Sequence, residues 1–170
     1  RRTRQIHWIV DTEGNTGKST FTNVLDINPN SGCLLLQTDY YRSFKHNLAI
    51  DIMEYMERHD EEPKAFIIDA PRDEETKYLH EVYGALEELK NGRVFSSFGG
   101  KRIRLRINME KPIFVFSNSP PVLATMSKDR WDIKAIVRSN ADDDYICLDA
   151  KVEANVSSWT NQTVSWQNVT

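Results

Sequence analysis

The chain has few of the residues that form disulfides or interrupt helices and strands: its 170 residues include only two cysteines, six prolines and seven glycines. Both cysteines, Cys33 and Cys147, lie in apolar strand-like runs, which favours buried thiols in a reducing compartment over a disulfide or a metal site. No apolar run approaches the roughly 18 residues that a membrane-spanning helix requires. These shortages exclude a disulfide scaffold and a membrane span, and the length suits one folded core.

The chain also has no excess of positive charge: it has 22 Lys and Arg against 25 Asp and Glu, and its formal net charge is −3. A protein of this composition does not grip nucleic acid over its whole surface, so a nucleic-acid binder must concentrate its cations in one place. The chain does so once, in a segment of six residues: Lys101, Arg102, Arg104 and Arg106.

Apolar runs typical of strands alternate with segments of helical periodicity. The predicted strands are residues 6–10, 33–37, 65–69, 112–116 and 145–148, and the predicted helices lie at 18–26, around 48–56 and, with a cap at Asp73, up to Asn91-Gly92. Several strands are continuously apolar, as expected when both faces of a parallel sheet are buried. The pattern predicts an α/β fold with a central five-stranded, mostly parallel sheet flanked by helices.

Two features interrupt this alternation. Residues 93–97 and 102–107 flank Phe98-Gly99-Gly100-Lys101, which predicts a β-hairpin inserted before the fourth core strand. After Ala150 the sequence becomes polar and irregular. We therefore expect one domain over residues 1–150 and a peripheral or partly ordered polar tail over 151–170.

A phosphate-binding loop is predicted where the first strand meets the first helix. Its expected nucleotide-binding residues are Gly14, Asn15, Thr16, Gly17, Lys18, Ser19 and Thr20. Backbone N–H groups and the helix N-terminus would hold the phosphates of ATP, with Lys18 on the β- and γ-phosphates and Ser19 on Mg²⁺. The strict pattern has glycine where this chain has Thr12, and the alternative is a turn that binds nothing.

Polar residues also end two later apolar strands. Asp69 would hold Mg²⁺ beside the phosphate loop, although Ala70 replaces the second acid that usually follows, so the general base is unassigned between Glu74 and Asp73. Asn118 could donate to the γ-phosphate or to the attacking water, or could merely start the turn before Pro120.

Taken in order, these segments resemble the motifs of superfamily 3 helicases. The motifs are Gly-Asn-Thr-Gly-Lys-Ser-Thr, Ile-Ile-Asp-Ala-Pro-Arg, Leu-Lys-Asn-Gly-Arg-Val-Phe-Ser-Ser, Val-Phe-Ser-Asn-Ser-Pro-Pro and Ser-Lys-Asp-Arg-Trp. They are most similar to the helicase domain of replication-associated (Rep) proteins of circular single-stranded DNA viruses. The resemblance implies an AAA+-like ATPase that forms a hexameric ring, translocates on single-stranded DNA during rolling-circle replication, and works in the host nucleus.

The resemblance also implies roles for the basic residues. Lys101 and Arg102, at or beside the hairpin tip, would hold DNA phosphates. Arg104 would share a strand face with Arg106, and the two could line the same channel or pair with a neighbouring subunit's acids. The alternative is an exposed strand edge protected by charge. Arg130 would be the arginine finger that reaches a neighbouring subunit's γ-phosphate, or else a surface arginine paired with a nearby aspartate.

The four histidines form no metal-ligand or paired-histidine spacing. We therefore expect that the nuclease half of a Rep protein is absent and that this chain, which begins Arg1-Arg2, is an excised C-terminal domain. Two other functions stay open: a P-loop nucleoside or nucleotide kinase, and an ATP-gated scaffold for DNA binding or packaging.

Overall fold

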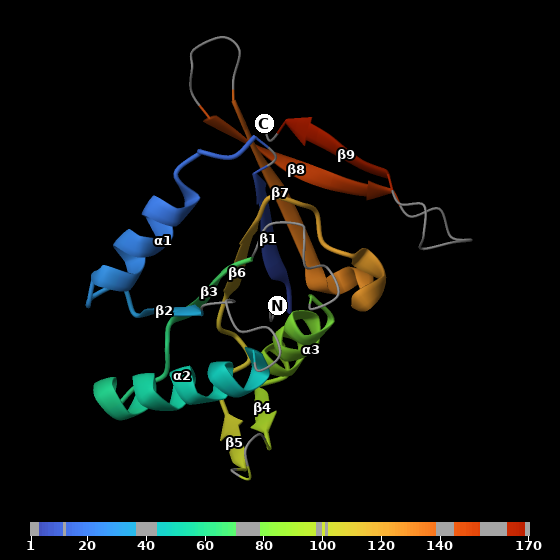
Figure 1. The fold of residues 1–170 in the computed structure, drawn as a ribbon. Coiled ribbons are helices and arrows are strands. Elements are labelled where there is room, and N and C mark those ends of the chain that lie inside the picture. The colour runs from blue at the N-terminus through green and yellow to red at the C-terminus, as the bar shows by residue number, and fades with distance from the viewer. Residues whose placement is uncertain are drawn as a thin grey trace.

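A computed structural model describes residues 4–11, 13–36, 44–70, 79–97, 100, 102–138, 145–153 and 163–168. Helices and strands alternate along the first part of the chain, and strands dominate the last part (Figure 1). The elements are β1 (Ile6–Asp11), α1 (Lys18–Ile27), β2 (Cys33–Leu36), α2 (Phe44–His59), β3 (Ala65–Asp69), α3 (Leu79–Lys90), β4 (Arg93–Ser96), β5 (Ile103–Arg106), β6 (Ile113–Ser117), the short 3₁₀ turns η4 (Leu123–Thr125) and η5 (Lys128–Arg130), β7 (Trp131–Arg138), β8 (Tyr145–Glu153) and β9 (Thr163–Asn168). Among the described residues, no helix is long and apolar enough to cross a membrane.

The main sheet has seven strands in the order β2-β3-β6-β1-β7-β8-β9. The first five strands in this order are parallel, and β8 and β9 add to the edge as antiparallel strands. The predicted α/β class with a parallel core flanked by helices is therefore confirmed. The β1 strand lies between β6 and β7, so the segment that follows β1 emerges at the middle of the sheet.

One prediction about the C-terminal part was wrong. The fifth parallel strand is β7, whereas residues 145–148 belong to the antiparallel strand β8, which continues to Glu153. Charged residues alternate with apolar ones along β7, so it lacked the continuous apolar run on which the strand prediction depended. Within the expected polar tail, β8 continues to Glu153 and β9 pairs with β8, so these parts of the tail belong to the sheet.

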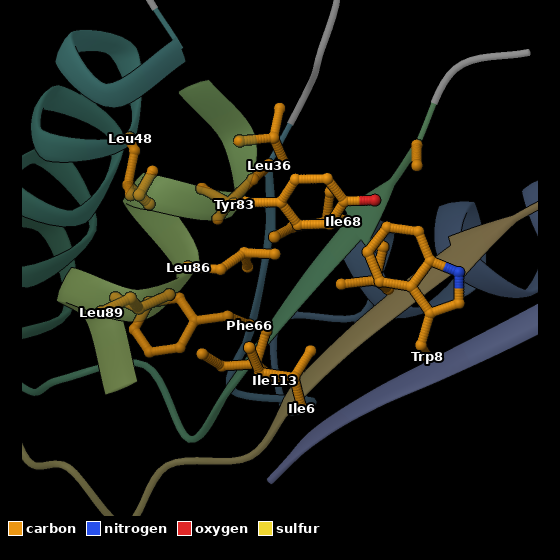
Figure 2. Packing of buried hydrophobic residues seen from close by; sticks show 14 of the residues in the cluster. Ile6, Trp8, Leu36, Leu48, Phe66, Ile68, Tyr83, Leu86, Leu89 and Ile113 are labelled. Atoms are coloured by element: carbon orange, nitrogen blue, oxygen red, sulfur yellow. The ribbon is translucent and has the colours of Figure 1, made fainter. Parts of the chain in front are cut away.

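Helices cover the two faces of the sheet unequally. The α2 and α3 helices pack together over one face, where buried side chains from β1, β3 and β6 form the core with Leu48, Leu86 and Leu89 (Figure 2). The α1 helix covers the other face, where Phe21 contacts Phe116 edge-on at 5.9 Å between ring centroids. Apolar side chains remain exposed on α1, with Val24 at 58% and Ile27 at 79%.

The predicted β-hairpin is present as β4 and β5, an antiparallel pair separate from the main sheet. Gly92 joins it to the end of α3 with φ of +68°, and a Cβ there would come within 2.6 Å of the Ile107 carbonyl oxygen. Only glycine fits this position without strain, so Gly92 determines the direction in which the chain leaves α3 and enters the hairpin. The hairpin projects from the end of the molecule opposite to the start of α1 (Figure 1).

Candidate functional site

The loop between β1 and α1 has the backbone of an anion-binding turn. Gly14, Asn15 and Gly17 all have left-handed φ angles, of +75°, +59° and +88°. Successive turns of this kind direct backbone N–H groups toward one concave side, where they can bind an anion. The N-cap residue of α1 is Gly17, and it makes no side-chain hydrogen bond to the first N–H groups of the helix. The positive end of the helix dipole therefore faces the loop without a side-chain cap from this residue.

Asp11, which the sequence analysis did not select, is the residue around which the loop is organised. Its side chain is completely buried at the end of β1. It accepts hydrogen bonds from the Gly14 N–H at 2.8 Å, from Thr16 Oγ1 at 2.5 Å and from Lys18 Nζ at 2.7 Å. A charged residue directly after an apolar strand and before a glycine-rich loop was the available signal.

The loop therefore already binds one carboxylate from its own chain. Burial by itself would raise the pKa of Asp11, but the hydrogen bonds from Lys18, Thr16 and Gly14 outweigh burial and lower it. Asp11 is consequently an anion at neutral pH. Its donors are a backbone N–H, a hydroxyl and an ammonium, which are the groups that also bind phosphate oxygens.

Lys18 connects the loop to a second predicted residue. Its Nζ donates to Asn118 Oδ1 at 2.7 Å while it also pairs with Asp11, and only 11% of its side chain is exposed. The two contacts place an ammonium between the end of β1 and the end of β6. Lys18 and Asn118, which the sequence suggested separately as phosphate-site residues, thus lie in contact in the fold.

Hydrogen bonds around Asn118 hold the segment after β6 in place. Trp8 Nε1, from the buried face of β1, donates to the Ser119 carbonyl oxygen at 2.9 Å. The Ser119 N–H donates to Ser117 Oγ at 3.1 Å, which closes a tight turn directly around Asn118. Asn118 therefore both starts a turn and presents its amide to Lys18, so the two sequence-based interpretations are compatible.

Asp69 lies at the same edge of the sheet as the loop. Its β3 strand pairs with β6, and Asp69 is level with Phe116, two residues before Asn118. Ser19 and Thr20, in the first turn of α1, are exposed. Within the described part of the chain no three His, Cys, Asp or Glu side chains cluster as a metal site, so the Mg²⁺ role of Ser19 and Asp69 stays a prediction. Thr12, Asp73 and Glu74 lie outside the described residues.

Arg130 does not fit the predicted arginine finger. Its side chain is only 3% exposed and donates within its own chain, to Asn91 Oδ1 at 2.8 Å and to the Arg4 carbonyl oxygen at 3.4 Å. Arg4 precedes β1, so Arg130 lies near the end of the sheet opposite to the phosphate loop. A finger must reach out of its own subunit, and a guanidinium buried by local packing cannot do so. The alternative prediction of a surface arginine is wrong for the same reason.

The hairpin cations are exposed, as their predicted role requires. Arg102 directly precedes β5, and Arg104 and Arg106 lie within it. All three side chains are exposed, and their spacing of two residues places them on the same side of the strand. The Arg104 guanidinium lies over the Phe95 ring, 5.4 Å from its centroid. Lys101 lies outside the described residues, so its predicted DNA contact is neither supported nor opposed by this geometry.

Comparison with known proteins adds no further evidence: no protein-family model matches the chain, and no curated protein or solved structure matches it significantly.

Proposed function

We propose that this chain is an AAA+-like P-loop ATPase that uses Mg²⁺-ATP to move along single-stranded DNA, as a replicative helicase domain of the superfamily 3 type. The observation that carries the proposal is the 2.7 Å contact between Lys18 Nζ and Asn118 Oδ1. It joins the phosphate loop to a polar residue at the end of the neighbouring strand, where a γ-phosphate would lie in a site of this kind.

The residues of the loop fit a triphosphate. The N-terminus of α1 has no side-chain cap, and a Cβ built at Gly14 or Gly17 meets no atom within 4 Å, so space beside the loop is open. Asp11 shows that the loop's donors already converge on an oxyanion. Lys18 and the loop N–H groups would hold the phosphates, and Ser19 with Asp69 would hold Mg²⁺. Bound Mg²⁺-ATP would supply the phosphoanhydride bond whose hydrolysis drives movement.

Binding requires Lys18 to change partners. In the structure its ammonium is shared between Asp11 and Asn118, and both contacts are partly buried. Phosphate oxygens would compete with the Asp11 carboxylate for this ammonium. Asn118 would then be free to contact the γ-phosphate region, so its amide can report whether the nucleotide is present.

The proposal includes a ring of subunits, which would be hexameric, with ATP between neighbours. The exposed apolar side chains of α1, next to the phosphate loop, are consistent with a neighbouring subunit on this side. Because Arg130 is buried, the residue that completes a neighbour's site is not assigned. The location in a host nucleus and the role in rolling-circle replication belong to the same proposal.

Steady-state ATP turnover by this chain, measured with and without single-stranded DNA, tests the function. A helicase motor hydrolyses ATP faster when DNA is present, and DNA unwinding accompanies that hydrolysis. A nucleoside or nucleotide kinase would need a phosphate acceptor and would ignore DNA. A scaffold gated by ATP would bind both ligands without sustained turnover. Either of the last two results would overturn the proposal.

A further inference from the structure

A pocket of about 540 Å³ lies beside the hairpin, away from the phosphate loop. It is lined by residues from the end of α3, from β4 and from the segment after β5: Glu88, Asn91, Arg93, Phe95 and Met109. None of these residues is used by the proposed nucleotide site. The volume lies within the range of small-ligand sites, which is about 300–1,000 Å³.

The hairpin strand that borders this pocket has one strongly cationic face. Arg93 pairs with Arg106 and Phe95 pairs with Arg104 across the two strands. These side chains are exposed, whereas Val94 and Ser96, the alternate residues of β4, are buried. Residues paired across strands share a face, so a single aromatic ring lies among arginines on the solvent side.

Phe95 and Met109 are the apolar surfaces of the pocket. They are 39% and 43% exposed, so both side chains offer apolar surface to a ligand in the pocket. Arg104 lies over the Phe95 ring but does not line the pocket, so the ring also has surface that faces the pocket. An aromatic ring flanked by arginines is the arrangement on which single-stranded nucleic acids stack their bases.

The polar residues of the pocket are held in fixed positions. Asn91 Oδ1 accepts a hydrogen bond from the buried Arg130 guanidinium at 2.8 Å, which leaves the Asn91 Nδ2 group as the donor available to a ligand. Glu88 forms an ion pair with Lys45, and its other oxygen accepts from the Phe95 N–H at 3.4 Å. The negative charge of Glu88 is therefore balanced, and Arg93 leaves the pocket with a positive charge.

We propose that this pocket takes one base of single-stranded DNA, stacked against Phe95, with the neighbouring phosphates on Arg93 and the hairpin arginines. The Asn91 amide donates to an acceptor on the edge of the base. This inference rests on the proposed function for the identity of the strand, and it adds a base-binding position to a surface otherwise expected to contact phosphates alone. Stacking is tolerant of sequence because every base has a π-face.

The test uses an oligodeoxythymidylate and the same oligonucleotide with abasic sites, each labelled for fluorescence anisotropy, with no ATP present. Phe95→Leu should weaken binding to the normal strand roughly fivefold or more, the lower end of the loss for one stacked base. It should leave the slope of affinity against salt unchanged.

Wild-type protein should lose a similar factor on the abasic strand, and the Phe95→Leu variant should not distinguish the two strands. Phe114→Leu, at a partly exposed phenylalanine of β6 that stacks on His7, is the matched control and should bind as wild type.

Arg93→Gln provides the complementary result, because a lost phosphate contact should reduce the salt slope by about 0.7 on a single strand. Arg58→Gln, at an exposed arginine in the last turn of α2, should not. If Phe95→Leu binds as wild type, or still prefers the normal strand to the abasic one, the proposed base pocket is wrong. In that case the proposed function is still supported if variants of the hairpin arginines weaken DNA binding. If wild-type protein binds neither strand, the proposed function fails together with this inference.

Discussion

The ammonium of Lys18 lies 2.7 Å from the side-chain oxygen of Asn118, although the two residues are 100 positions apart in the chain. The contact exists because β1 and β6 are parallel neighbours whose carboxyl ends meet at one edge of the sheet. A second bond ties the same ammonium to the buried Asp11. The proposed nucleotide site is thus already assembled, with an internal carboxylate bound by the groups that would hold phosphate.

Asp11→Asn tests whether this internal ion pair competes with nucleotide. Removing the charge frees Lys18, so saturating Mg²⁺-ATP should raise the melting temperature of the variant more than that of the wild type. Without nucleotide the variant should be less stable by about 1–3 kcal/mol, because the amide has one acceptor oxygen in place of two and turns its NH2 group toward donors. Thr16→Val removes one of the hydrogen bonds to Asp11 and keeps the charge. If this control shows the same enlarged response to nucleotide, competition for Lys18 is not the cause.

Asp69→Asn should separate metal-dependent chemistry from nucleotide binding. An amide keeps the size of the side chain but is a poorer Mg²⁺ ligand, so the variant should bind ATP and lose Mg²⁺-dependent hydrolysis. The comparison is Asp132→Asn, which removes a carboxylate paired with His7 at the start of β7 and should not change turnover. Unaltered Mg²⁺ dependence in Asp69→Asn would show that the metal is held by other residues.

Periodicity and turn chemistry predicted four of the five parallel strands, the hairpin and the glycine-containing turn between β1 and α1, because the signals for these elements are local in sequence. That this turn binds phosphate stays a prediction. Arg130 could not be predicted in this way. Its environment is made by Asn91 at the end of α3 and by the backbone before β1, and neither lies near it in sequence. Asp11 was overlooked because a charged residue after a strand has many uses, and only the folded loop reveals its donors. The β7 strand was missed because its alternating pattern resembles an exposed segment.

Arg130→Ala should therefore destabilise the fold rather than abolish hydrolysis. The change leaves the Asn91 and Arg4 oxygens without their donor and opens a cavity, at a cost of roughly 1–3 kcal/mol of unfolding free energy. Denaturant unfolding measures this, with Lys128→Ala as the exposed neighbouring control. An arginine finger predicts the reverse: unchanged stability and turnover lower by about a thousandfold. That outcome would restore the finger and require Arg130 to leave its buried position.

Lys90 should make stability depend on pH above neutrality. Its side chain is buried and donates to the Lys111 carbonyl oxygen, and burial together with the nearby Arg130 charge lowers its pKa from 10.5 to about 8. At pH values between these two pKa values, Lys90 binds its proton more in the unfolded chain than in the folded one. The free energy of unfolding should therefore rise as pH increases through this range. Unfolding by urea at pH 7.5 and at pH 9.5 measures the rise, and Lys90→Met should flatten it. A slope unchanged by the substitution would contradict the assignment.

Calorimetric titration of the chain with Mg²⁺-ATP, performed on the wild type and on Lys18→Ala, tests the central claim most directly. Lys18 is the cation expected to bind the phosphates, so its loss should abolish or strongly weaken binding. The melting temperature without nucleotide shows whether the variant remains folded. Lys128→Ala, which removes an exposed lysine elsewhere, should titrate as wild type. If the wild type does not bind ATP, or if Lys18→Ala binds it equally well, the loop after β1 is not a nucleotide site.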